Sequence, residues 1–466
     1  MKKIIIVILF LISIFIIGFL PVKDTDFGWH YRCGKQFITE KKPCLTNEFS
    51  YFLPDYKSAY PSFFYDVPLA FIYDRFGFIG ISVLGSLIFS LSALVFINLF
   101  SAPLWLAIAG CFLTFLLSFN TFSLGLRSQI LSYLFFLIAL FVLKLAKRNK
   151  HWLFSLPLIF FFWVNTHIGF FLGLIILGFY LFDSFVKKEK ETIYVLLVMI
   201  LAFAATFINP FGFRVYLEIV NHAFSPLNKM IAEWVEPANW QIILIILLSI
   251  LTLISYLKNK SLSIFSCLMI FFFLIMGLKA RRNLPFFYTT IFYFLTPTII
   301  LFHDRDKVID RLLVPILISL IVFLSVIQIP KTVSFDTSWD EYYNNGLSVL
   351  PCQAIKKYPR LSGKVYNAYE WGGFLIWQKP EIKVFVDGRM PAWKDENGIS
   401  PYQVYLEIIQ AQPGWNEKLN KLKTDYLLIQ NGTFLDLLIE KEAKKYHWQE
   451  VYRDETAVIY KNTLIN

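Results

Sequence analysis

The N-terminal stretch MKKIIIVILFLISIFIIGFLPVKDTDFGWHYRCGKQ, Met1 to Gln36, joins an apolar run to a pair of carboxylates. Residues 4–20 are almost entirely apolar, two lysines precede them, and Asp24 and Asp26 follow within a few residues. A run of this length can span the hydrocarbon core of a bilayer. Because no small-residue cleavage site follows it, we expect an uncleaved anchor rather than a signal peptide. The stretch therefore predicts a membrane span that ends at a D-x-D motif on the membrane surface.

The composition extends this reading to most of the chain. Of 466 residues, 57% are hydrophobic and 50 are Phe, whereas soluble domains are about 45–50% apolar. The net charge is +11, and many of the Lys and Arg residues lie in short clusters between apolar runs. Such clusters determine how a protein is oriented in the membrane. They do not indicate a nucleic-acid partner. We expect an integral membrane protein with apolar segments near residues 4–20, 78–100, 103–119, 128–146, 152–164, 168–185, 192–208, 240–257, 262–278, 284–302 and 311–329.

The basic clusters predict how these segments cross the membrane, because Lys and Arg favour cytoplasmic loops. Residues 147–150 and 187–190 are both basic, so the apolar run between them must cross twice and turn near 163–167. With the N-terminus and residues 258–260 and 303–307 also inside, the chain has about 11 transmembrane helices, a cytoplasmic N-terminus and an extracytoplasmic C-terminus. The sequence Lys279-Ala280-Arg281-Arg282 breaks the pattern, since it falls on the external side.

The C-terminal residues from about 331 have a polar, mixed composition. KVYNAY, IKVFVDGR and DYLLIQ read as strands, TFLDLLIEKEAKKYHW as a helix, and WQEVYRDETAVIYKN as a terminal pair of strands. The predicted fold class is thus an α-helical polytopic membrane protein (residues 1–330, with a long first external loop, 21–77) followed by a soluble extracytoplasmic α/β domain (331–466). Asp387-Gly388-Arg389 reads as a turn with a salt-bridged pair. Cys33 and Cys44 share the first loop, where they either pair or stay free.

The unusual polar residues of the membrane part all fall on the predicted outer side. Asp24 and Asp26 are either solvated or two ligands for a hard divalent cation whose shell is completed by water or phosphate. Arg127 is either an interfacial arginine or a clamp on a lipid-borne phosphate. Asn165 and His167 lie at the predicted turn, as hydrogen-bonded structural groups or facing a cavity. The remaining candidates for substrate contact are His30, Glu233, Arg281 and Arg282.

Other chemistries leave no signal in the sequence. Walker A, G-x-S-x-G and H-E-x-x-H motifs are absent, which argues against an ATP-driven pump and a serine hydrolase.

Several stretches together carry a resemblance to a known group. DTDFGWHYRCGKQFITEKKPCLTNEFSYF resembles the opening of bacterial multi-spanning proteins grouped with the GT-C glycosyltransferases, near the RgtA/B/C/D-like and protein mannosyltransferase-like domains. Further matches are LRSQILSYLF, WVNTHIGFFLG, INPFG, IAEW, RRNLPFF, YNAYEWGGFLIW, VFVDGR and PGW. Two departures stand out: Ser128 occupies a position where the group often has Pro, and YPSFFYDVPLAFIY lacks the usual W-x-x-x-EW element.

The resemblance implies a membrane glycosyltransferase that takes a sugar from a polyprenyl-phosphate carrier on the outer face. The acceptor is a glycan, lipid or protein of the cell envelope. GT-C enzymes carry an acidic residue in the first external loop, and Asp24 and Asp26 match that position. We expect Asp26 to act as general base and Asp24 to bind a metal, Mg²⁺ or Mn²⁺, or the substrate; the reverse order is the alternative, since the spacing does not decide which acid faces the pocket. The alternative is a non-catalytic glycan- or lipid-binding membrane protein or an envelope-polymer transporter, which would require charged or broken helices near the bilayer midplane.

Overall fold

The computed structural model describes residues 2–100, 102–225, 230–231, 233–259, 263–303, 319–323, 327 and 350–465. The chain forms two compact units. One comprises Met1–Val22, Phe78–Gly212 and Lys229–Ser334, and the other Lys23–Gly77, Phe213–Asn228 and Phe335–Asn466. We call them the helical unit and the sheet unit. The predicted span 311–329 lies largely outside the described residues, and so does the predicted domain boundary at 330/331; both stay predictions.

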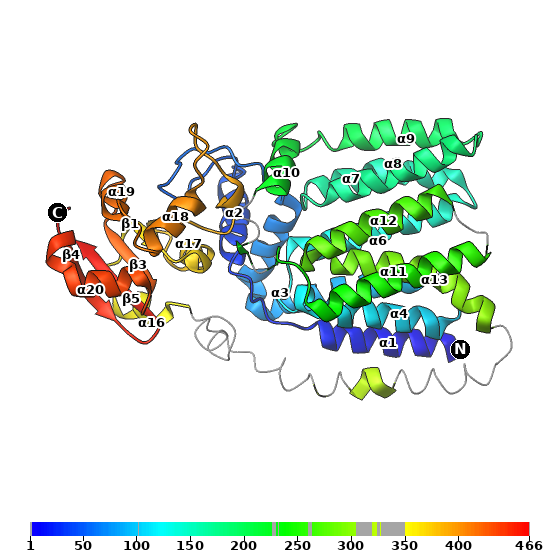
Figure 1. Ribbon diagram of the computed structural model, residues 1–466, viewed down its shortest axis with the longest axis horizontal. Helices are drawn as coiled ribbons and strands as arrows, with labels where there is room; N and C mark the ends of the chain where they lie inside the picture. The colour runs from blue at the N-terminus through cyan, green and yellow to red at the C-terminus, as the bar shows by residue number, and fades with distance from the viewer. Residues whose placement is uncertain are drawn as a thin grey trace. The chain divides into compact units, whose positions relative to one another are not determined.

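The helical unit consists of apolar helices that run side by side (Figure 1). The α7–α9, α8–α12 and α12–α13 pairs are in contact, and α13 also packs on α4 and α11. The helices are α1 (Lys2–Gly18), the part of α3 (Phe63–Leu99) from Phe78 onward, α4 (Leu104–Leu117), α5 (Phe119–Phe122), α6 (Ser128–Ala146), α7 (Leu156–Val164), α8 (Phe170–Val186), α9 (Thr192–Ala205), α11 (Asn239–Asn259), α12 (Ile264–Lys279) and α13 (Leu284–His303), with 3₁₀ turns η1 (Lys150–Ser155) and η3 (Arg281–Asn283).

Each apolar segment predicted between residues 4 and 302 coincides with helix. In the described part of the chain, three helices are long and apolar enough to cross a membrane, namely Phe63–Leu99, Ser128–Ala146 and Asn239–Leu257. Six further apolar helices are 10–17 residues long. The helical, membrane-type architecture is therefore confirmed, whereas about 11 crossings and their orientation stay predictions.

The region of the predicted hairpin between the two basic clusters contains two packed helices, α7 and α8, whereas their double crossing of a membrane stays a prediction. Helix α7 ends at Val164 and α8 begins at Phe170, so the chain reverses between them. The buried Trp163 donates from Nε1 to Ser132 Oγ on α6 (2.6 Å). A Cβ on Gly173 of α8 would stand 2.5 Å from the Trp163 ring, which explains why a glycine is needed where the two helices meet.

The sheet unit is built on a five-stranded mixed sheet of order β2-β1-β3-β5-β4. Strands β1 (Gly363–Asn367), β2 (Ile382–Val384) and β3 (Tyr426–Gln430) are parallel, whereas β4 (Trp448–Arg453) and β5 (Ala457–Asn462) join antiparallel. The helices that follow residue 350 are α16 (Cys352–Lys357), α17 (Gly372–Gln378), α18 (Pro401–Ile409), α19 (Trp415–Lys421) and α20 (Phe434–Tyr446), with turns η4 (Tyr369–Trp371) and η5 (Met390–Ala392). Helix α10 (Arg214–Phe224) belongs to the same unit. This confirms the predicted C-terminal α/β fold, strand by strand.

The first loop belongs to this same compact unit. It contains α2 (Phe27–Glu40) and the first part of α3, and residues 49–51 run along the free edge of β2. Val384 N donates to Phe49 O (3.0 Å) and Tyr51 N to Val384 O (3.2 Å), while the Tyr51 hydroxyl bonds to Thr424 Oγ1 (2.9 Å). An exposed strand edge is a template for unwanted pairing, and here residues of the first loop cover it.

Two features shape the first loop itself. Cys33 and Cys44 form a disulfide with Cα atoms 5.5 Å apart, which resolves the alternative left open by the sequence and fits an oxidising, extracytoplasmic setting. Gly77 lies inside α3 with φ 57° and ψ −154°, a conformation that a side chain rarely adopts. The glycine therefore separates the loop part of α3 from the apolar part.

Candidate functional site

The D-x-D motif forms the turn that opens α2. Asp24 Oδ1 accepts a hydrogen bond from the main-chain N–H of Asp26 (3.0 Å), and Asp26 O accepts one from His30 N (3.2 Å). Both carboxylates are half-buried. The amino end of a helix stabilises negative charge, so this turn holds two acids in a fixed arrangement at a favourable position.

The Asp26 carboxylate lies against the turn that follows β2. A Cβ on Gly388 would stand 2.1 Å from Asp26 Oδ1, so a side chain at this position would displace the Asp26 carboxylate. Burial raises the pKa of Tyr369 well above its ordinary value, and the charge of Asp26 raises it further. The Tyr369 phenol consequently stays protonated near this carboxylate and can donate a hydrogen bond. Neither Gly388 nor Tyr369 stood out alone in the sequence, although both lie in the stretches VFVDGR and YNAYEWGGFLIW that carry the resemblance.

Glycines bring α2 and α17 into main-chain contact. A Cβ on Gly28 would stand 1.7 Å from Gly373 O, and one on Gly373 would stand 2.0 Å from Thr25 O. Such approaches exclude any side chain. These contacts fix the D-x-D turn against α17 within the sheet unit.

The turn Asp387-Gly388-Arg389 holds the predicted salt bridge and is fully enclosed. Arg389 contacts Asp387 through Nε (2.8 Å) and Nη2 (2.7 Å), and Nη2 also donates to Asn47 Oδ1 (3.3 Å). Asp387 is 0% and Arg389 4% exposed. The guanidinium lies 5.8 Å from the centre of the Trp29 ring. This pair therefore ties the first loop to the end of β2.

His30 pairs with a carboxylate that sequence reasoning missed. His30 Nδ1 lies 2.5 Å from Asp66 Oδ1, Asp66 Oδ2 accepts from Ser62 Oγ (2.9 Å), and both His30 and Asp66 are 7% exposed. Asp66 is an isolated acid 36 residues away in a semi-apolar stretch, so no local pattern could have identified it. The buried pair fixes the first turn of α2, and a contact of His30 with substrate stays a prediction.

In the helical unit, four of the predicted residues come together. Arg127 Nη1 donates to Glu233 Oε1, and Gln129 Nε2 approaches Glu233 Oε2 (3.5 Å). Arg282 N donates to Glu233 O (3.3 Å), and its guanidinium lies 4.3 Å from the centre of the Trp234 ring. Arg281 reaches Glu236 O through Nε (3.1 Å). We call Arg127, Glu233, Arg281 and Arg282 the arginine cluster.

Asn165 and His167 lie in the turn between α7 and α8. Asn165 Nδ2 donates to Phe161 O (2.9 Å) and Ile208 O (2.8 Å), and His167 Nδ1 accepts from Gly169 N (2.9 Å). These bonds stabilise the turn between α7 and α8, which favours the structural interpretation of both residues.

The pKa of Glu233 in the arginine cluster is shifted by burial and by the neighbouring arginines. Burial by itself would raise the pKa of Glu233, but the charges of Arg127 and Arg282 outweigh it and hold the pKa below its ordinary value of 4.5. A depressed carboxyl pKa contributes stability that is present above pH 4.5 and is lost as the pH falls through the folded-state pKa.

We therefore expect Glu233→Gln to lower the thermal unfolding midpoint of the purified chain at pH 7. Hydrogen bonds to charged groups are worth about 1.5–3 kcal/mol. The difference from wild type should shrink below pH 4.5 and vanish in strong acid. Midpoints measured across this pH range test the prediction, and a difference that is independent of pH would contradict it.

The described residues contain no group of three or more His, Cys, Asp or Glu side chains arranged to bind a metal ion. Asp24 and Asp26 supply two carboxylates, which suit a hard cation such as Mg²⁺ or Mn²⁺ only if water or a substrate phosphate completes its shell. The residues present thus fit a metal that binds together with substrate, and not a resident structural ion.

Comparison with known proteins places the fold. The sequence matches no family model, and no curated protein matches it. Among solved structures, the Archaeoglobus fulgidus oligosaccharyltransferase AglB with an inhibitory peptide and a dolichol-phosphate superposes with a TM-score of 0.62 at 12% identity, covering 99% of this chain and 74% of that one. The apo enzyme gives 0.59 at 11% identity (97% and 74%), and the complex with Zn and sulfate gives 0.58 at 12% (97% and 73%). The chain therefore has a fold similar to that of this oligosaccharyltransferase, in agreement with the resemblance of its sequence to the GT-C group.

Proposed function

We propose that the protein is a membrane glycosyltransferase that moves a sugar from a polyprenyl-phosphate carrier to a cell-envelope glycan, lipid or protein on the outer face of the membrane. The observation that carries the proposal is the pair Asp24 and Asp26, held at the amino end of α2 within an AglB-like fold. AglB was solved with a dolichol-phosphate and a peptide, which supports a lipid phosphate and an acceptor as the two substrates.

The carboxylates divide the chemistry between them. Asp26, seated against Gly388 with a protonated Tyr369 nearby, accepts the proton of the acceptor hydroxyl as the new glycosidic bond forms. The bond from the sugar to the carrier phosphate breaks, and the phosphate leaves with its electrons. Asp24, whose Oδ1 is already oriented by the Asp26 N–H, is assigned to the substrate or to a cation.

A divalent cation, Mg²⁺ or Mn²⁺, would be held by Asp24 and Asp26 and would supply positive charge to the leaving phosphate. One AglB structure contains Zn and sulfate, a divalent cation and a phosphate-like anion, which supports this assignment.

The arginine cluster is assigned to the phosphate of the carrier. Arg127 is held by Glu233, whereas Arg281 and Arg282 bring two further positive charges, and arginine offers a planar fork that matches phosphate oxygens. The proposed base, Asp26, belongs to the sheet unit, and the arginine cluster belongs to the helical unit. The two roles are therefore tested with separate variants.

Substituting the cluster arginines should weaken donor binding. A charge-assisted contact is worth about 1.5–3 kcal/mol, so Arg281→Gln and Arg282→Gln should each raise the dissociation constant for a polyprenyl-phosphate sugar by roughly tenfold to more than a hundredfold. Arg127→Gln should weaken binding too, because Glu233 then loses its partner. Lys279→Gln, which removes an exposed cation two residues away, is the matched control and should bind like wild type. Unchanged affinity in all three arginine variants would contradict the assignment.

The proposed function as a whole is tested in liposomes that contain the purified chain, a radiolabelled polyprenyl-phosphate sugar and an envelope-glycan extract. Label should move to the acceptor, and mass spectrometry of a deletion strain should show envelope glycans that lack one sugar. If the donor binds but is never consumed, or if it crosses the bilayer unchanged, the chain is a binding protein or a transporter instead.

A further inference from the structure

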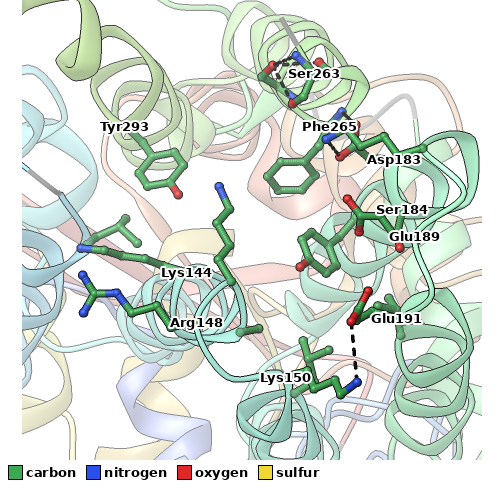
Figure 2. Close-up of a pocket in the computed structure, with 18 of the residues that line it drawn as sticks. Lys144, Arg148, Lys150, Asp183, Ser184, Glu189, Glu191, Ser263, Phe265 and Tyr293 are labelled. Carbon is green, nitrogen blue, oxygen red and sulfur yellow. Dashed lines mark hydrogen bonds and ion pairs between the residues drawn. The ribbon is translucent and has the colours of Figure 1, made fainter. Parts of the chain in front are cut away.

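A cavity of about 840 Å³ opens at the end of the helical unit where α6 and α8 finish and α9 and α12 begin (Figure 2). This volume is in the range of small-molecule sites, about 300–1,000 Å³. The lining is amphipathic, since aromatic side chains such as Phe100, Phe265 and Phe294 alternate with charged ones. None of the residues assigned to sugar transfer lines the cavity.

Five cationic side chains and three carboxylates line this cavity, namely Lys144, Lys147, Arg148, Lys150, Lys187, Asp183, Glu189 and Glu191. Two of the acids already hold a lysine. Asp183 Oδ2 lies 2.6 Å from Lys187 Nζ, and Glu191 Oε1 lies 3.6 Å from Lys150 Nζ. Asp183 also accepts from the main-chain N–H of Phe265 (3.2 Å), at the start of α12. These acids therefore serve the protein's own structure, and the cavity keeps a surplus of positive charge.

The surplus charge is concentrated on one wall. Figure 2 shows Lys144 and Arg148 on one side of the cavity and Asp183, Ser184 and Glu189 across from them. Lys144 Nζ donates to the main-chain oxygen of Asn98 (2.8 Å). Lys147 and Arg148 are exposed and form no ion pair within the described residues. Their positive field is not cancelled locally.

We infer that this cavity binds the headgroup of an anionic phospholipid, with Lys147 and Arg148 at the phosphate and the aromatic lining against the glycerol and acyl carbons. Basic pockets between membrane helices recognise anionic headgroups, and this one lies where apolar helices end in basic loops. Those loops, 147–150 and 187–190, are the ones that the charge bias predicts to be cytoplasmic. A soluble phosphate ion would use the cationic wall but would leave the aromatic lining without a partner.

Native mass spectrometry of the full-length chain in detergent tests this inference with added phosphatidylglycerol and, separately, phosphatidylcholine of identical acyl chains. We expect one phosphatidylglycerol to bind saturably and more tightly than phosphatidylcholine. The double variant Lys147→Gln/Arg148→Gln should bind it roughly thirtyfold more weakly, because each basic residue near an anionic lipid contributes about a fivefold factor.

The matched control is Lys188→Gln/Lys190→Gln, which removes the same charge from the neighbouring loop without altering the lining. It should bind phosphatidylglycerol like wild type. Equal losses in the two double variants would show diffuse attraction and overturn the site. Equal binding of the two lipids would overturn the preference for an anionic headgroup. Displacement of the lipid by excess inorganic phosphate would identify a free-anion site and overturn the lipid assignment. None of these outcomes depends on whether the chain transfers sugar.

Discussion

Asp26→Asn is expected to lower the turnover number of sugar transfer by a factor of about 10²–10⁴, the usual contribution of a general base. The amide has nearly the shape of the carboxylate but cannot accept the acceptor's proton. The main-chain contacts of residue 26 with Asp24 Oδ1 and His30 N would remain, so the variant should fold and bind donor as wild type does. The measurement is initial transfer rate in reconstituted membranes at saturating donor.

Two further variants sharpen this test. Asp74→Asn changes an exposed acid on the same loop that bonds to Tyr31 and Lys35, and it should keep wild-type turnover. Asp24→Asn retains an oxygen that can accept from the Asp26 N–H, so its effect should fall on donor or cation affinity. If only Asp24→Asn silences transfer, the roles of the two acids are exchanged. Wild-type turnover in both Asp24→Asn and Asp26→Asn would refute the transferase mechanism.

Asp387→Ala should destabilise the sheet unit by about 3–5 kcal/mol, because it leaves the guanidinium of Arg389 buried without its carboxylate. Both residues are almost fully enclosed, so water cannot replace the lost partner. Hydrogen–deuterium exchange of the β1 and β2 amides in the full-length chain reports on this unit directly. Exchange rates should rise by two orders of magnitude or more.

The comparison variants for this prediction lie close by. Glu381→Ala removes one side of the exposed Lys379–Glu381 pair beside β2 and should leave exchange unchanged, since exposed pairs contribute little. The double variant Asp387→Ala/Arg389→Met removes both buried charges and should be less damaging than Asp387→Ala alone. Wild-type exchange in Asp387→Ala would mean that Arg389 finds solvent or another acid.

Local patterns in the sequence were sufficient to locate most helices and strands of this fold. Apolar runs located the helices, and the basic clusters at 147–150 and 187–190 located the hairpin between α7 and α8, because membrane insertion makes hydropathy and charge decisive. Short runs rich in β-branched, aromatic and other apolar residues predicted β1, β2 and β3. The number of membrane crossings does not follow from these patterns, because six apolar helices have only 10–17 residues and a span needs about 20.

Apolar runs and charge clusters do not show which distant segments of the chain are in contact. The contact of Asp26 with Gly388 and the pairing of residues 49–51 with β2 join segments more than 300 residues apart. The partner of His30, Asp66, lies 36 residues away within the first loop. Segment 49–51 is too short to show strand alternation. The pairing of Arg127 with Glu233 is equally invisible to a local pattern, because the two residues are 106 positions apart.

The pairing of residues 49–51 with β2 also has a consequence for folding during synthesis, because the two segments are made at different times. Residues 49–51 leave the ribosome before most of the helical unit, and β2 follows only after roughly 330 more residues have been made. At about 5–20 residues per second this takes on the order of 17–66 s. Throughout that interval the loop has an unpaired backbone edge and no partner for Tyr51, while the disulfide between Cys33 and Cys44 can already close. Early oxidation would hold α2 and its carboxylates compact during the wait, so the loop reaches the late-arriving sheet as a prefolded piece.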